Sequence, residues 1–194
     1  MPLIPDPEID NAGGAYVPAG FPSAFADAGY CGRSFNRGLV RFHDAKSGPE
    51  FRELVLTAFA GQIHPDADVL AFDWQARQIV TVPTGEGVML YLADVGTADV
   101  YELATPEEFA AVLTLDNVGE VFNEERFVAF RETNNVADAA LAFTECVEFE
   151  HPLFLGGEDS LSNMAVTDTS VYWTIIGALV AKTADVPPGT VIGG

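Results

Sequence analysis

Three short β-like runs follow one another with very little chain between them, and this constrains the fold more than any other feature. The runs are residues 69–73, 77–82 and 88–92. Residues 73–76 are a tight connection, and residues 83–87 contain the Pro and Gly of a turn. Parallel neighbours would need a crossover of about a dozen residues, so only antiparallel pairing fits. We predict an antiparallel meander of about four to five strands, which residues 38–43 and 99–103 complete.

Helical patterns precede and follow this meander. Residues 49–59 carry apolar side chains at three-and-four spacing, which predicts a helix with one face in the core. Residues 105–108 read Thr-Pro-Glu-Glu, a capping box that begins a helix ending near residue 115. Further helices are predicted at residues 118–130, 136–143 and 169–183, with a connection at residues 145–162.

The chain is predicted to form one α+β domain. Its 194 residues suffice for one well-formed core and are few for two. We expect a central, mainly antiparallel sheet flanked by helices, β-rich at residues 38–103 and α-rich at residues 104–194. Residues 1–37 contain five prolines and no sustained periodicity, which predicts an irregular N-terminal extension. Its five aromatic residues indicate that it packs on the domain, because disordered segments are poor in aromatic residues.

The charge of the chain excludes several classes of partner. There are 29 Asp and Glu against 9 Lys and Arg, a formal net charge of -20. Such a field repels nucleic acids and anionic membrane surfaces, and it attracts cations or a basic protein. Residues 99–194 hold 17 acids and 3 bases, so most of the field comes from the second half. A basic protein is therefore the expected partner, and acidity that serves only solubility is the alternative.

The chain is predicted to be cytoplasmic, with two free thiols. No basic segment followed by a long apolar run opens the sequence, so a signal peptide is not expected. The apolar stretch at residues 171–181 has about half of the roughly twenty residues that a bilayer requires, so no membrane span is expected. Outside an oxidising compartment Cys31 and Cys146 are expected to stay reduced, although their even number allows one disulfide.

No motif predicts catalysis, a metal or a cofactor. The sequence has no G-x-S-x-G, and its histidines are His43, His64 and His151. His64, Asp66, Asp68 and Asp73 lie close together and could bind a hard cation, but Asp is common in turns that precede strands. Glu145, Glu148 and Glu150 beside His151 leave an acid and base pair open, whereas a solvated acidic edge explains them more simply. The glycine pair at residues 156–157 lacks the spacing of a phosphate-binding loop and is expected to be a turn.

Four segments, taken in order, carry a resemblance to a known family. They are residues 72–78 (FDWQARQ), 152–163 (PLFLGGEDSLSN), 171–173 (VYW) and 187–190 (PPGT). They resemble segments of the immunity proteins paired with type VI secretion DNase effectors, a family with a GAD-like front segment and a C-terminal immunity domain formerly of unknown function. The resemblance spans roughly residues 34–193. Relatives often have Leu-Gly in place of Gln75-Ala76, where glycine permits a special turn conformation.

The resemblance implies a non-enzymatic protein that binds and neutralises a secreted antibacterial toxin of the nuclease class by covering its active or substrate-binding surface. Toxins that act on nucleic acid carry positive surfaces, which an acidic protein can occupy. The candidate toxin-binding residues are Glu124, Glu125, Glu145, Glu148, Glu150, Glu158 and Asp159. No catalytic residue, metal or cofactor is expected, and the oligomeric state stays open. The alternatives are a general protein-interaction scaffold, a hydrolase that reverses a toxin modification, and a nucleic-acid mimic.

Overall fold

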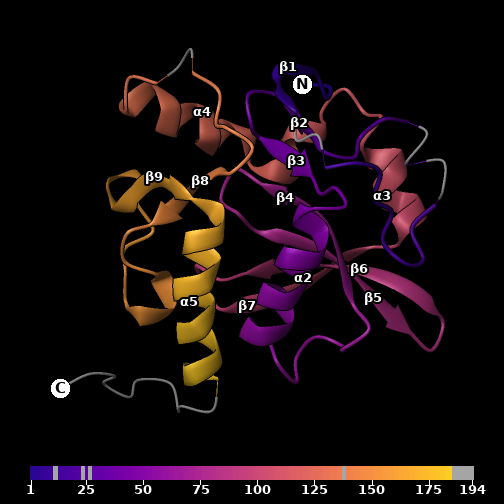
Figure 1. Cartoon of the computed structure of the whole chain (residues 1–194). Helices are drawn as coiled ribbons and strands as arrows, with labels where there is room; N and C mark the ends of the chain where they lie inside the picture. The colour runs from indigo at the N-terminus through magenta and orange to yellow at the C-terminus, as the bar shows by residue number, and fades with distance from the viewer. Residues whose placement is uncertain (11–12, 23–24, 26–27, 137–138, 185–194) are drawn as a thin grey trace.

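Seven strands pair in the order in which they follow one another along the chain, and each pair is antiparallel (Figure 1). The structure is a computed structural model that describes residues 1–10, 13–22, 25, 28–136 and 139–184. The strands are β1 (Pro5–Asp10), β2 (Arg33–Phe35), β3 (Val40–Phe42), β4 (Asp68–Asp73), β5 (Gln78–Thr84), β6 (Gly87–Asp94) and β7 (Asp99–Ala104). The predicted antiparallel meander is confirmed, and its five strands are β3 to β7.

The sheet is larger than the predicted four to five strands because residues 1–37 contribute β1 and β2. β1 contains Pro5 and Pro7, which the sequence pattern takes as breakers. It lies at the edge of the sheet, where a strand tolerates proline because one side of it needs no ladder hydrogen bonds. β2 has only three residues, too few for an alternating pattern to be recognised. Between them, Phe21 and Phe25 are buried, in keeping with a segment that packs on the domain.

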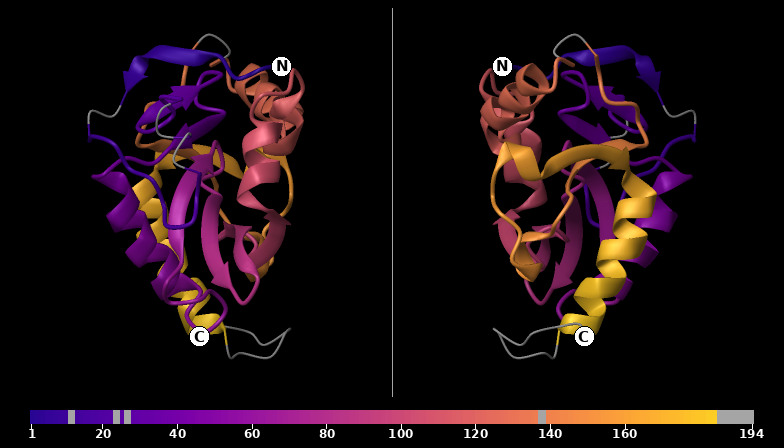
Figure 2. Two further views of the ribbon diagram at one scale, coloured as in Figure 1. Left: turned by 90° about the vertical axis from the view of Figure 1, so that its right-hand side faces the viewer. Right: turned by 90° about the vertical axis from the view of Figure 1, so that its left-hand side faces the viewer.

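Helices cover both faces of the sheet (Figure 2). On one face lie α2 (Ser47–Ala58) and α5 (Thr169–Thr183), and on the other lie α3 (Pro106–Val112), the 3-10 helix η1 (Val118–Phe122) and α4 (Glu124–Thr133). Neighbouring side chains of a strand point to opposite faces, so Val80 joins the core beneath α2 and α5 while Ile79 joins the core beneath α3 and α4. The predicted capping box at Thr105 and Glu108 is present at the start of α3. The result is an α+β domain with two apolar cores.

The second half of the chain contains a small sheet that the sequence did not predict. β8 (Glu145–Phe149) and β9 (Met164–Asp168) pair antiparallel, and the short 3-10 helices η2 (Leu153–Leu155) and η3 (Leu161–Asn163) lie between them. β8, η2 and most of η3 lie in the predicted connection at residues 145–162, and β9 follows it. The expected helical C-terminal half is therefore correct for α3, α4 and α5, whereas residues 145–168 form a β-ribbon.

Two of the predicted helices differ in the structure. The helix expected at residues 118–130 is interrupted at Asn123, whose φ of 55° is left-handed, and η1 and α4 take its place. Of the helix expected at 136–143, residues 136 and 139–143 are not helical, and 137–138 lie outside the described residues. Here the Leu141 N–H donates to the Arg37 carbonyl at 3.2 Å, and the buried Arg41 guanidinium donates to the Ala142 carbonyl at 3.1 Å. The backbone around residues 141 and 142 is therefore bonded to the front half of the chain.

The turn between β4 and β5 joins the two halves of the chain. Trp74 Nε1–H donates to the Phe122 carbonyl of η1 at 2.9 Å, and Trp173 Nε1–H of α5 donates to the Ala76 carbonyl at 2.8 Å. Both indoles are buried, so Trp74 and Trp173 are core residues. The Val147 N–H of β8 donates to the Trp74 carbonyl at 2.8 Å. One turn therefore fixes η1, β8 and α5 against the sheet.

Ala76 in this turn takes the conformation that glycine would take more easily. Its φ is 63°, a left-handed value that strains a residue with a Cβ. The buried Asp73 carboxylate holds the turn, because its Oδ1 accepts the N–H groups of Gln75 and Arg77, each at 3.0 Å. Arg77 adds an ion pair to Asp73 Oδ2 at 2.6 Å. The turn conformation is thus kept without the glycine.

Three remaining expectations concern separate features of the chain. Cys31 and Cys146 are free thiols, as expected. Among the helices of the described residues, none is long and apolar enough to cross a membrane. The PPGT segment at residues 187–190 lies outside the described residues.

Candidate interaction surface

Helix α4 turns its basic side chains inward and most of its acidic side chains outward. The Arg126 guanidinium forms an ion pair with Asp159 and lies 5.8 Å from the centre of the Phe149 ring. Arg131 is buried, donates to the Ala139 carbonyl, and stacks over Phe127 at 5.1 Å. Glu125 and Glu132 on the same helix are exposed. The outer face of α4 is therefore acidic although the helix contains two arginines.

The loop between β8 and β9 presents further acids beside α4. Asn163 fixes this loop: its Nδ2 donates to the carbonyls of His151 at 2.8 Å and Glu158 at 2.9 Å, and its Oδ1 accepts the His151 N–H at 2.9 Å. At Gly157 an added Cβ would lie 1.8 Å from the His151 carbonyl oxygen, so only glycine fits. With the loop held in this way, the Glu158 and Asp159 side chains are exposed.

The structure divides the seven predicted toxin-binding acids into two groups. The first group has four members: Glu124 and Glu125 belong to α4, Asp159 is joined to it through Arg126, and Glu158 precedes Asp159 in the chain. Of these, Glu124 is half-buried and accepts a hydrogen bond from the Met1 amino group at 3.1 Å. The other three, Glu145, Glu148 and Glu150, lie on or just after β8.

The β8 group is less available than the α4 group. Glu145 is half-buried, and its Oε2 accepts the Ala142 N–H at 2.9 Å. Burial, and then the neighbouring charge of Glu150, raise the pKa of the half-buried Glu148 above its usual range. Glu150 is exposed. Residues 132–181 contain eight acids and no Lys or Arg, so this part of the chain supplies no base of its own to balance them.

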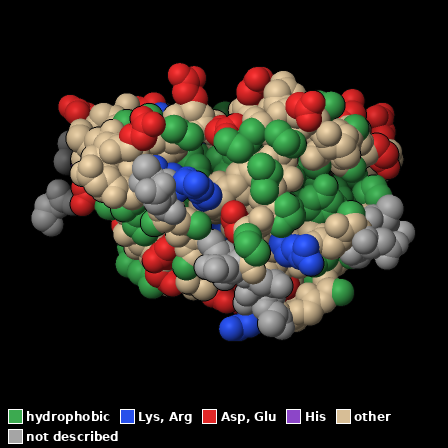
Figure 3. Space-filling model, turned by 90° about the horizontal axis from the view of Figure 1, so that it is seen from above, with side chains coloured by type: hydrophobic (Ala, Val, Ile, Leu, Met, Phe, Trp, Pro, Cys, Tyr) green, Lys and Arg blue, Asp and Glu red, His purple; other side chains and the backbone are tan. Residues whose placement is uncertain are grey.

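A groove lies between residues 1–7 and α4, and we call it the α4 groove. It has a volume of about 620 Å³. Its apolar lining includes Ile4, Leu39, Phe127 and Val128. Its charged lining consists of Asp6, Arg37, Glu124, Arg131 and Glu132. Figure 3 looks onto this face and shows hydrophobic side chains across its middle and acidic side chains along its upper edge. Sequence reasoning missed the groove, although Val128 between Glu125 and Glu132 on one helical face is a signal of it.

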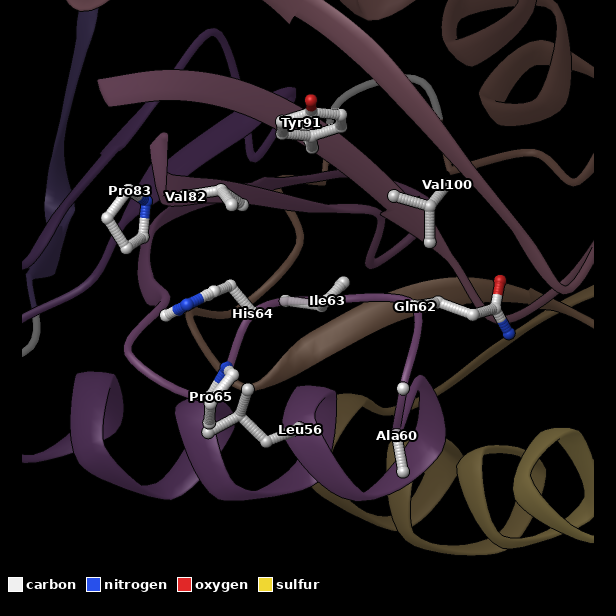
Figure 4. A pocket seen from close by; sticks show the side chains of 11 residues that line it. Leu56, Ala60, Gln62, Ile63, His64, Pro65, Val82, Pro83, Tyr91 and Val100 are labelled. Atoms are coloured by element: carbon white, nitrogen blue, oxygen red, sulfur yellow. The ribbon is translucent and has the colours of Figure 1, made fainter. Parts of the chain in front are cut away.

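A second cavity opens between the end of α2 and strands β5 to β7. Its volume is about 690 Å³, and Figure 4 shows Leu56, Ile63, Val82 and Val100 among the side chains that line it. Its polar lining groups are few, and two of them already have partners. The Tyr91 hydroxyl donates to Glu102 at 3.2 Å, and His64 Nδ1 accepts the Asp66 N–H at 3.2 Å. The cavity offers an apolar surface and no nucleophile paired with a base.

The three histidines do not assemble a catalytic centre within the described part of the chain. His43 is buried between Ser47 at 3.0 Å and Gln78 at 2.8 Å, and burial lowers its pKa to about 4, which keeps it neutral. His151 Nε2 lies 3.1 Å from the Leu155 carbonyl, and His64 is exposed.

The metal-ligand pattern noted in the sequence is not assembled either. Asp68 bonds the Tyr16 hydroxyl, and the buried Asp73 pairs with Arg77, while Asp66 is exposed. Among the residues that the structure describes, no group of three or more His, Cys, Asp or Glu side chains could hold a metal ion.

Comparison with known proteins adds a likeness of fold. No protein-family model matches the chain, and no curated protein matches it. A solved structure has the same fold. This is Atu4351 from Agrobacterium tumefaciens, with a TM-score of 0.58 and 14% sequence identity over 88% of this chain and 85% of that one. At this identity the likeness extends to the fold alone.

Proposed function

We propose that the chain is an immunity protein, which binds a basic antibacterial toxin of the nuclease class and covers the surface through which the toxin reaches its substrate. The observation that carries the proposal is the outer face of α4. There Glu125 and Glu132 face solvent, while Arg126 and Arg131 are engaged by internal partners. The motif resemblance in the sequence supports the same function.

Charge decides how such a protein would act. An acidic surface steers a basic partner during encounter, and this raises the association rate towards about 10⁸ M⁻¹s⁻¹ at low salt. The exposed Glu158 extends this acidic surface beyond α4, next to Asp159, which is paired with Arg126. A nuclease active site must attract phosphate, so an acidic protein bound there competes with the nucleic acid. Inhibition of this kind requires binding only.

The test uses the protein encoded by the neighbouring gene as the toxin. Cells that express it should die alone and survive when this chain is co-expressed, and the two proteins should co-purify at low salt. We call the exposed acids Glu125, Glu132 and Glu158, on and beside α4, the α4 surface. Glu125→Lys with Glu158→Lys should weaken binding on the order of tenfold or more, because two of these acids change sign. Glu53→Lys with Glu86→Lys makes the same change in net charge at exposed positions elsewhere and is the matched control.

The outcomes separate the alternatives. If Glu125→Lys with Glu158→Lys weakens binding and the control pair does not, the result supports binding through the α4 surface. If both double variants weaken binding equally, only net charge matters, as is expected for a nucleic-acid mimic. Co-purification without rescue indicates a scaffold, and turnover of a modified substrate would indicate a hydrolase. A neighbouring protein that neither kills cells nor binds this chain would remove the proposal.

A further inference from the structure

The α4 groove has an apolar centre and a charged border in which Asp6, Glu124 and Glu132 outnumber Arg37 and Arg131. Ile4 and Val128, which line it, are 56% and 40% exposed, so two large aliphatic side chains of opposite walls face solvent. Val121 on the preceding 3-10 helix is 47% exposed and lies two residues after Gly119, whose N–H contacts the Met1 carbonyl at 3.4 Å. Contiguous exposed apolar surface marks interaction sites, whereas single exposed apolar side chains are common on any protein. The exposed apolar side chains therefore make the groove a candidate docking surface.

The acids of this surface have a fixed spacing around Val128. Glu125 is three residues before it and Glu132 four residues after it, so the three side chains form one ridge on the outer face of α4. Glu125 and Glu132 are exposed, and neither has an ion pair among the described residues. A partner that seats an apolar side chain against Val128 thus brings its flanking residues to two unpaired carboxylates.

We infer that the α4 groove receives an apolar side chain from a basic segment of the partner protein, whose Lys or Arg side chains pair with Glu125 and Glu132. The identity of that partner rests on the proposed function. Interfaces commonly have this organisation, with a buried apolar anchor at the centre and charged residues around it. The apolar anchor sets how long the complex lasts, and the carboxylates set how fast it forms.

Electrostatic repulsion argues against a second copy of this chain as the occupant of the groove. Two copies that met through this groove would bring their own Glu125 and Glu132 together, because a twofold interface places the same patch on both sides. Each copy has a net charge of -20, so the pair would repel at the distance of contact. A segment with Lys or Arg on either side of an apolar residue removes this repulsion and satisfies the acids.

The inference is tested with Val128→Arg, which places a bulky positive charge on the groove wall. Val171→Arg is the matched control, since Val171 is 51% exposed on α5, on the opposite side of the sheet. The probe is the protein encoded by the neighbouring gene, made inactive as a toxin, and the measurement is its dissociation constant. Val128→Arg should raise the constant on the order of thirtyfold, the effect of losing a central anchor, whereas Val171→Arg should leave it within about twofold.

A second variant and two controls complete the test. Val128→Ala shortens the side chain without adding charge and should weaken binding on the order of threefold to tenfold. Circular dichroism should show that all three variants keep the fold, because each change is at an exposed helical position. Light scattering on the unaltered chain measures its oligomeric state.

Each outcome has a defined consequence. If the unaltered chain binds tightly and neither Val128→Arg nor Val128→Ala changes the dissociation constant, the groove is not the binding site. The proposed function then stays in place. Absence of binding by the unaltered chain overturns the proposed function and this occupant together. A dimer that Val128→Arg separates would show that a second copy fills the groove, which overturns the inference.

Discussion

Asp94, at the end of β6, gives the clearest prediction about stability. Its Oδ1 accepts the N–H groups of Gly96 at 2.8 Å and Thr97 at 3.3 Å and so holds the turn into β7. Burial raises the pKa of Asp94 from 3.8 to about 6, although Arg77 and the two turn hydrogen bonds act in the opposite direction. The change Asp94→Asn keeps an oxygen acceptor for the turn and removes the titrating group.

The sign follows from the direction of the shift. Because the folded protein binds this proton more tightly than the unfolded chain, the unfolded state holds fewer protons between about pH 4 and pH 6, and stability falls as pH rises through that window. A rise in the Asp94 pKa from 3.8 to about 6 can change the free energy of unfolding by at most about 3 kcal/mol across this pH window. Asp94 is only partly buried, so solvent screening lowers the expected effect to about 1–2 kcal/mol.

Urea unfolding of both proteins at pH 4.5, 5.5 and 7 measures this effect as a difference. The unaltered chain should gain about 1–2 kcal/mol relative to Asp94→Asn between pH 7 and pH 4.5, because only its Asp94 takes up a proton. Comparing two variants cancels the many other acids of the chain. Glu86→Gln, at an exposed position without an ion pair among the described residues, is the control for removing one carboxylate. A stability difference that does not change with pH would refute the reasoning.

Three further changes test the fold around the candidate surface. Gly157→Ala should lower the free energy of unfolding by about 1–3 kcal/mol, since its Cβ would meet the His151 carbonyl oxygen; an unchanged melting temperature would contradict this. Ala76→Gly should raise it by about 0.5–1 kcal/mol by relieving the left-handed conformation, and denaturant titration would show a loss if that strain were absent. Trp173→Phe should lower it by about 1–3 kcal/mol, because the buried Ala76 carbonyl loses its donor; a neutral result in the same titration would argue against that hydrogen bond.

The sequence predicts those parts of the fold whose signals are local. Strands β3 to β7 and helices α2, α3 and α5 have clear periodicity, short turns or a capping box, so their positions follow from nearby residues. The elements that were missed depend on distant partners. β1 is stabilised by pairing with β2 across more than twenty residues. Residues 139–143 are not helical, and the Arg37 carbonyl and the Arg41 guanidinium bind their backbone.

The candidate surface was predictable only as a list of acids. The sequence places Glu125 and Asp159 far apart, and they become neighbours because Arg126, adjacent to Glu125, bonds Asp159 33 residues further on. Glu145 was included with them for its charge, yet it serves a local turn with Ala142. The α4 groove depends on residues 1–7 lying beside α4, a tertiary contact that no local pattern encodes.

The central claim is that this chain binds a basic protein through the acidic surface around α4. The most direct measurement is the dissociation constant for the protein encoded by the neighbouring gene at 50 mM and 500 mM salt. The account predicts tight binding at low salt that weakens on the order of tenfold or more at high salt, because screening removes the attraction of Glu125, Glu132 and Glu158. No binding at low salt, or binding that is equally tight at both concentrations, would contradict it.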